Sequence, residues 1–207
     1  MNIHLDKIGK RYQRDWIFRS VDYQFKSGET YALSGPNGSG KSTFLRVLSG
    51  HLTPTKGKIS FSKKGEKIKS DQLYQSLSFV APYIELLEEF TLFEMINFHN
   101  KFKAFYDNIS VEKVIELAYL TENTDKEIRF FSSGMKQRVK LALGILSKSD
   151  FLIIDEPSTN LDEKGTEWYK NLIGDFHKNR TLIIASNLTE DFDFCNHELN
   201  ILDYKKK

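Results

Sequence analysis

A glycine-rich segment between an apolar run and a helical pattern constrains this chain more than any other feature. It fits the pattern G-x-x-x-x-G-K-[ST] and follows the apolar run Thr30 to Ser34. Its glycines let the backbone turn a row of N–H groups toward an anion. The helix expected from Ser42 to Gly50 adds the partial positive charge of its N-terminus, and the lysine adds a mobile cation. The segment predicts a site for the phosphates of a nucleotide, with the Ser42 hydroxyl as a Mg²⁺ ligand. Its nine residues are Gly35, Pro36, Asn37, Gly38, Ser39, Gly40, Lys41, Ser42 and Thr43.

An acidic pair follows a second apolar run and supplies the other half of such a site. Phe151 to Ile154 reads as a buried strand, and Asp155 and Glu156 come directly after it. Open α/β sheets bind ligands at this C-terminal end of their strands. We expect Asp155 to hold Mg²⁺, directly or through water, and Glu156 to polarise the attacking water as general base. An acidic pair that only caps a loop is the alternative, and it is the weaker one beside a phosphate loop.

The remaining chain alternates short apolar runs with longer helical patterns, which is typical of an α/β domain with a largely parallel sheet. The runs 151–154 and 182–185 are apolar on both faces, as in the centre of a sheet. From Tyr83 to Lys148 the sequence predicts only helices. The expected strands are Val21 to Phe25, Thr30 to Ser34, Lys58 to Phe61, Leu77 to Val80, Phe151 to Ile154, Leu182 to Ala185 and Leu199 to Leu202. The expected helices are Ser42 to Gly50, Thr91 to Tyr106, Val111 to Leu120, Gly134 to Ser147 and Glu163 to His177.

Composition narrows the class of partner. The 207 residues carry 30 basic and 28 acidic side chains, a net charge of +2 that gives no footprint for nucleic acid. The longest apolar runs fall short of the roughly 20 residues that span a bilayer, and the first residues lack the apolar core of a signal peptide. A single cysteine, Cys195, favours a reducing compartment. We therefore expect a soluble, cytoplasmic chain whose membrane contact comes only through a partner.

Over nearly its whole length the chain resembles nucleotide-binding subunits of the ATP-binding cassette (ABC) family. The family's signature, usually written L-S-G-G-Q, reads here Phe131-Ser132-Ser133-Gly134-Met135 and precedes a helix. In the family this surface completes the site of the opposite subunit. The resemblance implies a head-to-tail dimer of two cassettes, identical or related, with two ATP molecules between them. Ser158 to Asp162 resembles the D-loop at the same dimer boundary.

The resemblance also implies a fold and a domain plan. The fold is that of a P-loop NTPase, α/β in class, with a RecA-like, mostly parallel sheet core, an inserted α-helical subdomain and an N-terminal antiparallel β part. One ABC ATPase domain would span 1–207, with 1–82 and 149–207 as nucleotide-binding core and 83–148 as helical subdomain. In the family the surface of that subdomain receives a short helix from the membrane subunit. Tyr12 resembles the aromatic residue that stacks on adenine, ahead of Trp16.

Two positions depart from the family pattern, and both concern the γ-phosphate. A glutamine normally follows the strand that leads into the helical subdomain, and Tyr83 stands in that region. After the strand Leu182 to Ala185 the family usually has a histidine, and this chain has Asn187. An amide can donate a hydrogen bond but cannot carry a proton as histidine can. Losing one well-placed donor costs about 10² to 10³ in turnover. We expect normal ATP binding with slow hydrolysis, although Glu156 argues against a dead site; His197 reads as a surface histidine.

The leading functional prediction is the ATP-hydrolysing subunit of an ABC membrane transporter. ATP would close the cassette dimer and hydrolysis would reopen it, with the motion passed to separate transmembrane permease subunits at the inner face of the cell membrane. One alternative is a soluble ABC ATPase that acts on ribosomes or DNA; such relatives usually carry two cassettes or a long coiled-coil insert, unlike this chain. Another is a nucleotide sensor with negligible turnover, which Tyr83 and Asn187 suggest.

Overall fold

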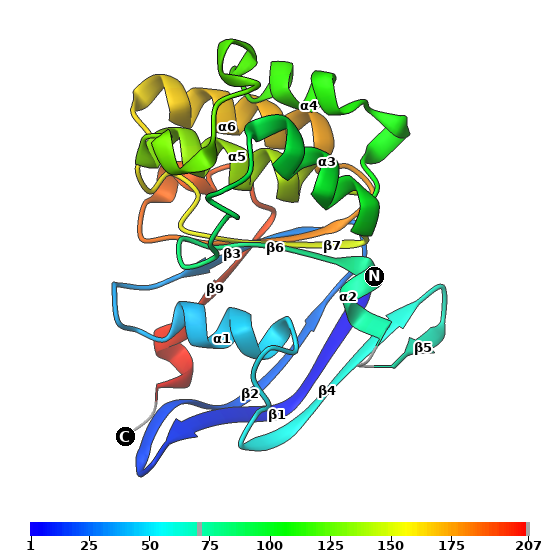
Figure 1. Ribbon diagram of the computed structural model, residues 1–207. Coiled ribbons are helices and arrows are strands. Elements are labelled where there is room, and N and C mark those ends of the chain that lie inside the picture. The colour runs from blue at the N-terminus through cyan, green and yellow to red at the C-terminus, as the bar shows by residue number, and fades with distance from the viewer. Residues whose placement is uncertain (70–71, 206–207) are drawn as a thin grey trace.

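The protein is built in layers, with a helix between two sheets and further helices above (Figure 1). The computed structural model describes residues 1–69 and 72–205. Its middle layer is a sheet in which every pair of neighbouring strands is parallel. In order across the sheet, the strands are β6 (Leu77–Val80), β7 (Phe151–Asp155), β8 (Thr181–Ala185), β3 (Thr30–Ser34) and β9 (His197–Asn200).

The parallel sheet sets where the candidate site lies. Every residue of β7 and β8 is buried, as their two-faced apolar runs predict. Asp155 at the end of β7 pairs with Ala185 at the end of β8, and β3 is the next strand. Because the strands are parallel, the segments that leave β3, β7 and β8 emerge at one edge of the sheet.

The lowest layer is an antiparallel sheet that begins with the first residues. β1 pairs with a neighbour on each side, and its alternate residues Ile3 and Leu5 are buried. The register shifts between Leu5 and Ile8, so a bulge breaks the period of two. Because of that interruption, the alternation of apolar and polar residues predicts no strand before Val21. The strands, in order across the sheet, are β2 (Asp15–Phe25), β1 (Asn2–Tyr12), β4 (Lys56–Lys63) and β5 (Glu66–Ile68).

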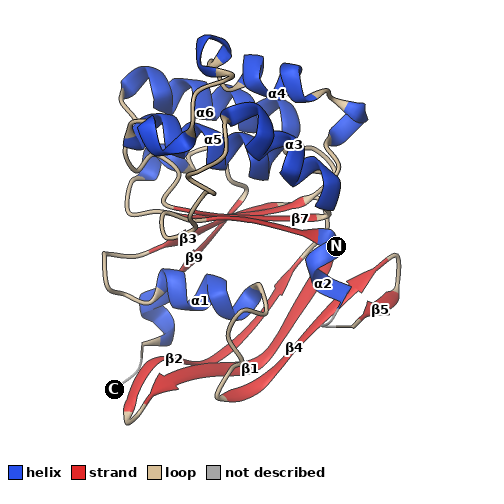
Figure 2. Cartoon of the chain, viewed as in Figure 1, coloured by secondary structure: helices blue, strands red, loops and turns tan. Residues whose placement is uncertain are grey.

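The helix α1 (Lys41–Leu48) packs between the two sheets. Phe44, Leu45 and Leu48 are fully buried and join one apolar core with side chains of both sheets. A second core lies above the parallel sheet, where helices cover its other face (Figure 2). These helices are α3 (Leu92–Phe102), α4 (Val111–Leu117), α5 (Ser133–Leu146) and α6 (Glu163–Phe176), and α2 (Leu73–Ser76) is a single turn before β6.

Most predicted elements are present, but several ends were wrong. The strand predicted from Val21 begins at Asp15, and the helix predicted to reach Leu120 ends at Leu117. The helix predicted to reach Tyr106 ends at Phe102, because Lys103 adopts extended backbone and its ammonium donates to the backbone oxygens of Tyr74 and Leu77. The strand predicted to reach Leu202 ends at Asn200. The Asn200 side chain accepts a hydrogen bond from the Leu202 N–H at 3.0 Å, which favours a 3₁₀ turn over continued strand.

The domain plan assigns 83–148 to a helical subdomain. This segment, all of it described, contributes α3, α4 and α5 and none of the named strands. The division into a nucleotide-binding core and a helical subdomain stays a prediction. Among the described residues no helix is both long enough and apolar enough to cross a membrane.

Candidate functional site

The loop between β3 and α1 has the strained backbone that its glycines predict. Gly35 and Gly40 have φ angles of 144° and 110°, a region that side chains disfavour. A Cβ on Gly40 would lie 2.5 Å from the Ile17 Cγ2 atom, and one on Gly35 would lie 2.8 Å from the Ser39 Oγ atom. Glycine is therefore required at both positions. The loop leads into the N-terminus of α1, whose free N–H groups attract an anion.

Lys41 is the first residue of α1 and is almost fully buried. Its ammonium donates to the Gly35 carbonyl oxygen at 2.8 Å and lies 3.3 Å from the Glu156 Oε1 atom. The structure thus brings the predicted phosphate-binding cation against the predicted general base, although 114 positions of sequence separate them.

Asp155 has the properties expected of a metal ligand. It is 1% exposed, and neither carboxylate oxygen has a hydrogen-bond partner of normal geometry. Burial raises the pKa of Asp155, while the nearby Ser42 hydroxyl opposes that rise and the negative charge of Glu156 adds to it. A buried carboxylate with free lone pairs beside a hydroxyl suits Mg²⁺, which prefers oxygen ligands. Among the described residues no cluster of three His, Cys, Asp or Glu side chains could hold a metal alone. Phosphate oxygens would have to complete such a site, as is usual for Mg²⁺.

Glu156 sits in an unusual backbone conformation directly after β7. Its φ angle is 48°, uncommon for a residue other than glycine, and its N–H donates to the Ala185 carbonyl oxygen at 2.7 Å. This bond ties Glu156 to the end of β8. The second carboxylate oxygen, Oε2, lies 3.3 Å from the Ser186 hydroxyl.

One hollow of about 530 Å³ brings Lys41 and Ser42 together with Glu156, whereas the predicted site residues Gly35, Ser39 and Asp155 do not line it. Most of the phosphate loop lines it, and Glu156 and Asn187 face it from the ends of β7 and β8. Sequence reasoning did not single out Ile17, which also lines the hollow; its only signal was its place beside Trp16. The lining residues are Ile17, Pro36, Asn37, Gly38, Gly40, Lys41, Ser42, Thr43, Glu156, Thr159 and Asn187.

Two predicted aromatic residues lie outside that lining. The Tyr83 ring packs against the guanidinium of Arg46, 4.0 Å from its centroid, and burial raises the pKa of Tyr83. Tyr12 lies at the end of β1 with 47% of its surface exposed and the Lys10 ammonium over its ring. His197 lies beside Glu29 at the beginning of β9, away from the strand ends that form the hollow.

The signature residues line a different hollow. Ser132 caps α5 by accepting a hydrogen bond from the Met135 N–H at 3.2 Å. A Cβ on Gly134 would lie 2.9 Å from the Asn160 carbonyl oxygen. The close approach of the D-loop-like segment therefore requires glycine at position 134. Ser132, Ser133 and Gly134 share this hollow with residues 160–162, and no residue of the phosphate loop lines it.

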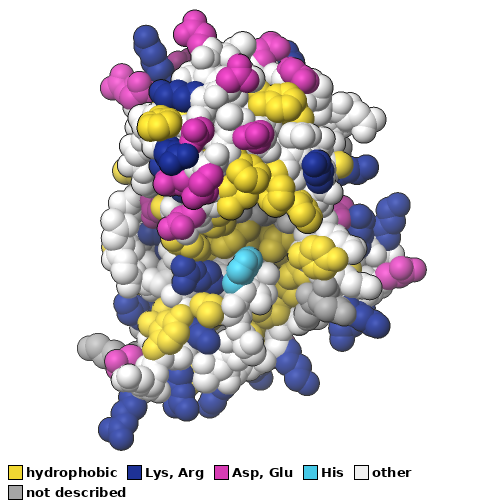
Figure 3. Space-filling view, in the orientation of Figure 1, with side chains coloured by type: hydrophobic (Ala, Val, Ile, Leu, Met, Phe, Trp, Pro, Cys, Tyr) yellow, Lys and Arg dark blue, Asp and Glu magenta, His cyan; other side chains and the backbone are white. Residues whose placement is uncertain are grey.

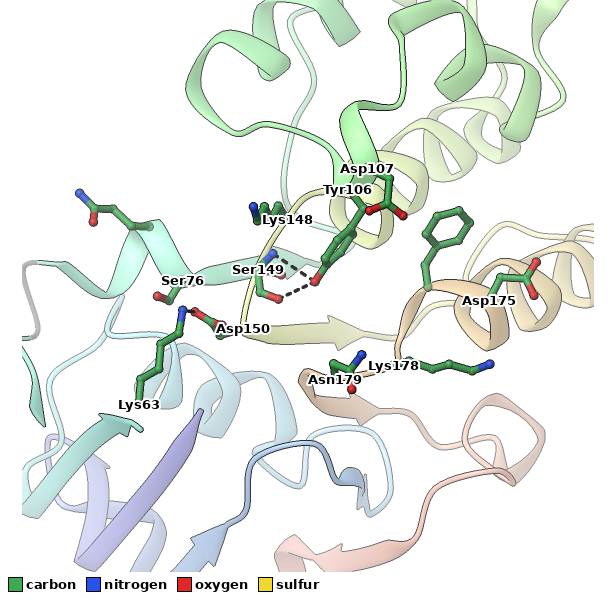
Figure 4. A pocket seen from close by; sticks show the side chains of 12 residues that line it. Lys63, Ser76, Tyr106, Asp107, Lys148, Ser149, Asp150, Asp175, Lys178 and Asn179 are labelled. Carbon is green, nitrogen blue, oxygen red and sulfur yellow. Dashed lines mark hydrogen bonds and ion pairs between the residues drawn. The ribbon is translucent and has the colours of Figure 1, made fainter. Parts of the chain in front are cut away.

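A polar cavity of about 550 Å³ lies at the opposite edge of the sheet, where β7 begins (Figure 4). Lys63 pairs with Asp150 at 2.7 Å, and the Tyr106 hydroxyl donates to the Ser149 carbonyl oxygen. Behind it the buried Arg180 guanidinium donates to the Ile145 carbonyl oxygen at 2.6 Å. That contact satisfies a carbonyl in the last turn of α5, so we assign Arg180 a structural role.

Comparison with known proteins decides the family. A family model described as ABC transporter matches residues 18–159. The chain belongs to the ABC transporter family. It is 31% identical over 191 residues to the uncharacterized ABC transporter ATP-binding protein YybJ of Bacillus subtilis (strain 168), covering 91% of this chain and 87% of that one. It is 26% identical to the Nod factor export ATP-binding protein I of Cupriavidus metallidurans, covering 99% of this chain and 69% of the relative.

Solved structures of ABC proteins share the fold. The dimeric cassette MJ0796, in a post-hydrolysis state bound to ADP and Pi, superposes with a TM-score of 0.82 at 21% identity over 96% of this chain and 93% of that one. A bacterial Atm1-family ABC exporter with ATP bound gives a TM-score of 0.80 at 22% identity, with 96% of this chain matching 37% of the exporter chain. The predicted ABC fold and the predicted role as an ATPase subunit of a transporter are therefore confirmed at the level of the family. The roles of individual residues stay predictions.

Proposed function

We propose that this ABC chain binds Mg²⁺-ATP in the hollow between the phosphate loop and Glu156, and that it hydrolyses ATP slowly to drive a membrane transporter. The observation that carries this proposal is the arrangement around that hollow. Lys41 and Glu156 lie 3.3 Å apart, and the unpartnered carboxylate of Asp155 is buried beside Ser42.

The chain's own groups have separate tasks in this proposal. Backbone N–H groups of the loop and Lys41 hold the phosphates, and Glu156 accepts the proton of the attacking water. Mg²⁺ held by Asp155 and Ser42 would neutralise charge on the phosphates. Asn187 donates an amide hydrogen bond where a histidine would also supply charge. The weaker stabilisation of the transition state is the reason for slow turnover.

The position of the signature hollow supports a dimer of cassettes. Ser132 and Gly134 offer a hydroxyl and a bare backbone at the N-terminus of α5, a place that attracts phosphate. They line a hollow separate from the chain's own phosphate loop. A second cassette, a copy of this chain or a related one, would bring its phosphate loop to this surface, and the similar cassette MJ0796 has been solved as a dimer.

An apolar groove supports docking of a membrane subunit. It lies between β6, α3 and α5, and Figure 3 shows apolar side chains gathered in the hollowed middle of this face. Its volume is about 250 Å³, suited to a few side chains of a short helix. We propose that a cytoplasmic segment of a transmembrane permease subunit fills it, which would hold the chain at the inner face of the membrane. The groove's apolar lining comprises Leu77, Phe79, Val80, Ala81, Ile84, Leu86, Met95, Leu143 and Gly144.

A Glu156→Gln variant tests the catalytic part of the proposal. It keeps the size of the side chain and removes the base, so ATP should hold two cassettes together without phosphate release. Light scattering should show an ATP-dependent dimer that the parent protein forms only transiently. Glu198→Gln, an exposed change on β9, should behave as the parent. Phosphate release by Glu156→Gln at the parent's rate would contradict the role of Glu156, and a parent protein that binds no ATP would contradict the function.

Ile84→Glu tests the membrane part. A charge in the apolar groove should prevent co-purification of a multi-span membrane protein from native membranes, identified by mass spectrometry, while ATP binding is retained. Leu202→Glu places the same charge at an exposed leucine outside the groove and should leave the complex intact. Equal recovery of the membrane protein with both variants would contradict docking in the groove.

A further inference from the structure

A buried aspartate lies behind the candidate general base and has no part in the function proposed so far. Asp191 is 0% exposed and ends the 3₁₀ turn Thr189–Asp191 after β8. Its Oδ2 atom accepts hydrogen bonds from the Ser186 hydroxyl at 2.5 Å and from the Ser158 hydroxyl at 3.0 Å. The Tyr169 hydroxyl of α6 donates to its carbonyl oxygen at 3.3 Å, which fixes the turn.

Ser186 stands between this aspartate and the base. Its single hydroxyl proton has two acceptors in reach, the Asp191 Oδ2 atom at 2.5 Å and the Glu156 Oε2 atom at 3.3 Å. The shorter contact is the stronger hydrogen bond. The Leu188 N–H donates to the same hydroxyl oxygen at 3.0 Å and fixes it from the other side. Asp191 therefore directs the Ser186 proton away from Glu156 and leaves that carboxylate oxygen available to accept a proton.

Ser158 connects the aspartate to the backbone of the base. It lies two positions after Glu156, whose φ of 48° persists only where neighbouring groups hold it. The Thr159 N–H donates to the Glu156 carbonyl oxygen at 3.3 Å, and the Leu161 N–H donates to the Ser158 carbonyl oxygen at 2.9 Å. Holding the Ser158 side chain therefore restrains the whole turn that follows Glu156.

We propose that Asp191 is a positioning residue for ATP hydrolysis, which through Ser158 and Ser186 holds Glu156 in its strained backbone conformation with one carboxylate oxygen free. The inference rests on the proposed function, in which Glu156 is the base. Asp191 touches neither phosphate loop nor metal ligands in the described contacts, so its effect should fall on the chemical step rather than on nucleotide binding.

Two substitutions of Asp191 test this role. Asp191→Leu keeps a side chain of similar size but removes the acceptor, and it should lower kcat about tenfold to a hundredfold, as small misplacements of catalytic groups do. The KM for ATP should change by no more than about twofold, because an effect on the chemical step leaves binding intact. Asp191→Asn keeps one acceptor oxygen for the two hydroxyls and should restore most of kcat. Glu190→Gln, in the same turn but exposed, is the matched control and should keep the parent's kcat.

A double-mutant cycle separates positioning from a general loss of packing. If Asp191 acts through the hydroxyls, adding Ser158→Ala or Ser186→Ala to Asp191→Leu should lower kcat little further. Additive losses, or a folded Asp191→Leu protein with the parent's kcat, would overturn the inference. If thermal unfolding shows that Asp191→Leu is not folded, Asp191→Asn and the two serine variants test the inference instead. A parent-like kcat in both serine variants would overturn it. Failure of the proposed function looks different, because Glu156→Gln would then leave phosphate release unchanged.

Discussion

Lys41 and Glu156 form an ion pair across the hollow, with 3.3 Å between Nζ and Oε1. Lys41 is 5% exposed and also donates to the Gly35 carbonyl oxygen. In the proposed function, a bound γ-phosphate would compete with Glu156 for Lys41, so the two residues should be examined together.

Lys41→Met should weaken ATP binding about tenfold to a hundredfold. Methionine fills similar space, but the charge-assisted bond that it removes is worth about 1.5–3 kcal/mol. Isothermal titration calorimetry with ATP measures the change in affinity. Lys63→Met is the control, because Lys63 pairs with Asp150 at the other edge of the sheet. If the parent and Lys41→Met bind ATP with equal affinity, Lys41 does not bind the phosphates.

Asn187→His should raise the rate of phosphate release, by up to about 10². Asn187 lines the hollow, so an imidazole there can supply the charge that an amide lacks. The gain should depend on the base, so the same change in a Glu156→Gln background should give none. If the parent already turns over as fast as Asn187→His, the slow-hydrolysis hypothesis is wrong.

Local patterns were enough to predict the strands that surround the site. β3 and β6 have the predicted bounds, because short apolar runs there end at turn-forming residues. β1 was missed at the level of residue patterns, because its bulge shifts the buried face partway along the strand. Antiparallel pairing with β2 and β4 stabilises β1, and such pairing leaves no mark on a single run of residues.

The contacts of the site were likewise predictable in part from the sequence. The meeting of Lys41 and Glu156 follows from parallel strands that end at one edge, so motif spacing was sufficient. The contacts of Tyr83 with Arg46 and of Asp191 with Ser158 join residues that are distant in the sequence, and Arg46 and Asp191 belong to no motif. Only the packed structure brings them together, which is why the sequence predicted neither contact. The role of Tyr83 stays a prediction.

Two helical glycines should respond to alanine in opposite ways. On Gly144, in α5, a Cβ would lie 2.1 Å from the Val80 Cγ2 atom, and the β-branched Val80 side chain has little freedom to move. Gly144→Ala should therefore lower the free energy of unfolding by about 1–3 kcal/mol. On Gly174, in α6, a Cβ would meet no atom within 4 Å, so Gly174→Ala should raise stability by about 0.5–1 kcal/mol. Urea unfolding compares the two; a stabilising Gly144→Ala would show that α5 does not pack on β6 this closely.

His99, a half-buried histidine that also lines the apolar groove, should make stability depend on pH. Burial, with the charge of Lys103 adding to it, lowers the pKa of His99 to about 4 from its usual value near 6.5. Its Nε2 atom lies 2.7 Å from the Ser147 hydroxyl, and the ring stacks on Phe105. Between pH 6.5 and pH 4 the unfolded chain therefore binds a proton that the folded chain does not, so acid favours unfolding in this window.

His99→Gln should remove that dependence while keeping a polar group near Ser147. The free energy of unfolding of the parent, relative to that of His99→Gln, should fall by about 2 kcal/mol between pH 7 and pH 5. Urea unfolding at a series of pH values measures both proteins. His4→Gln, which replaces an exposed histidine of β1, is the control for a histidine outside the groove. Parallel curves for the parent and His99→Gln would mean that His99 takes up its proton in the folded chain as easily as in the unfolded one.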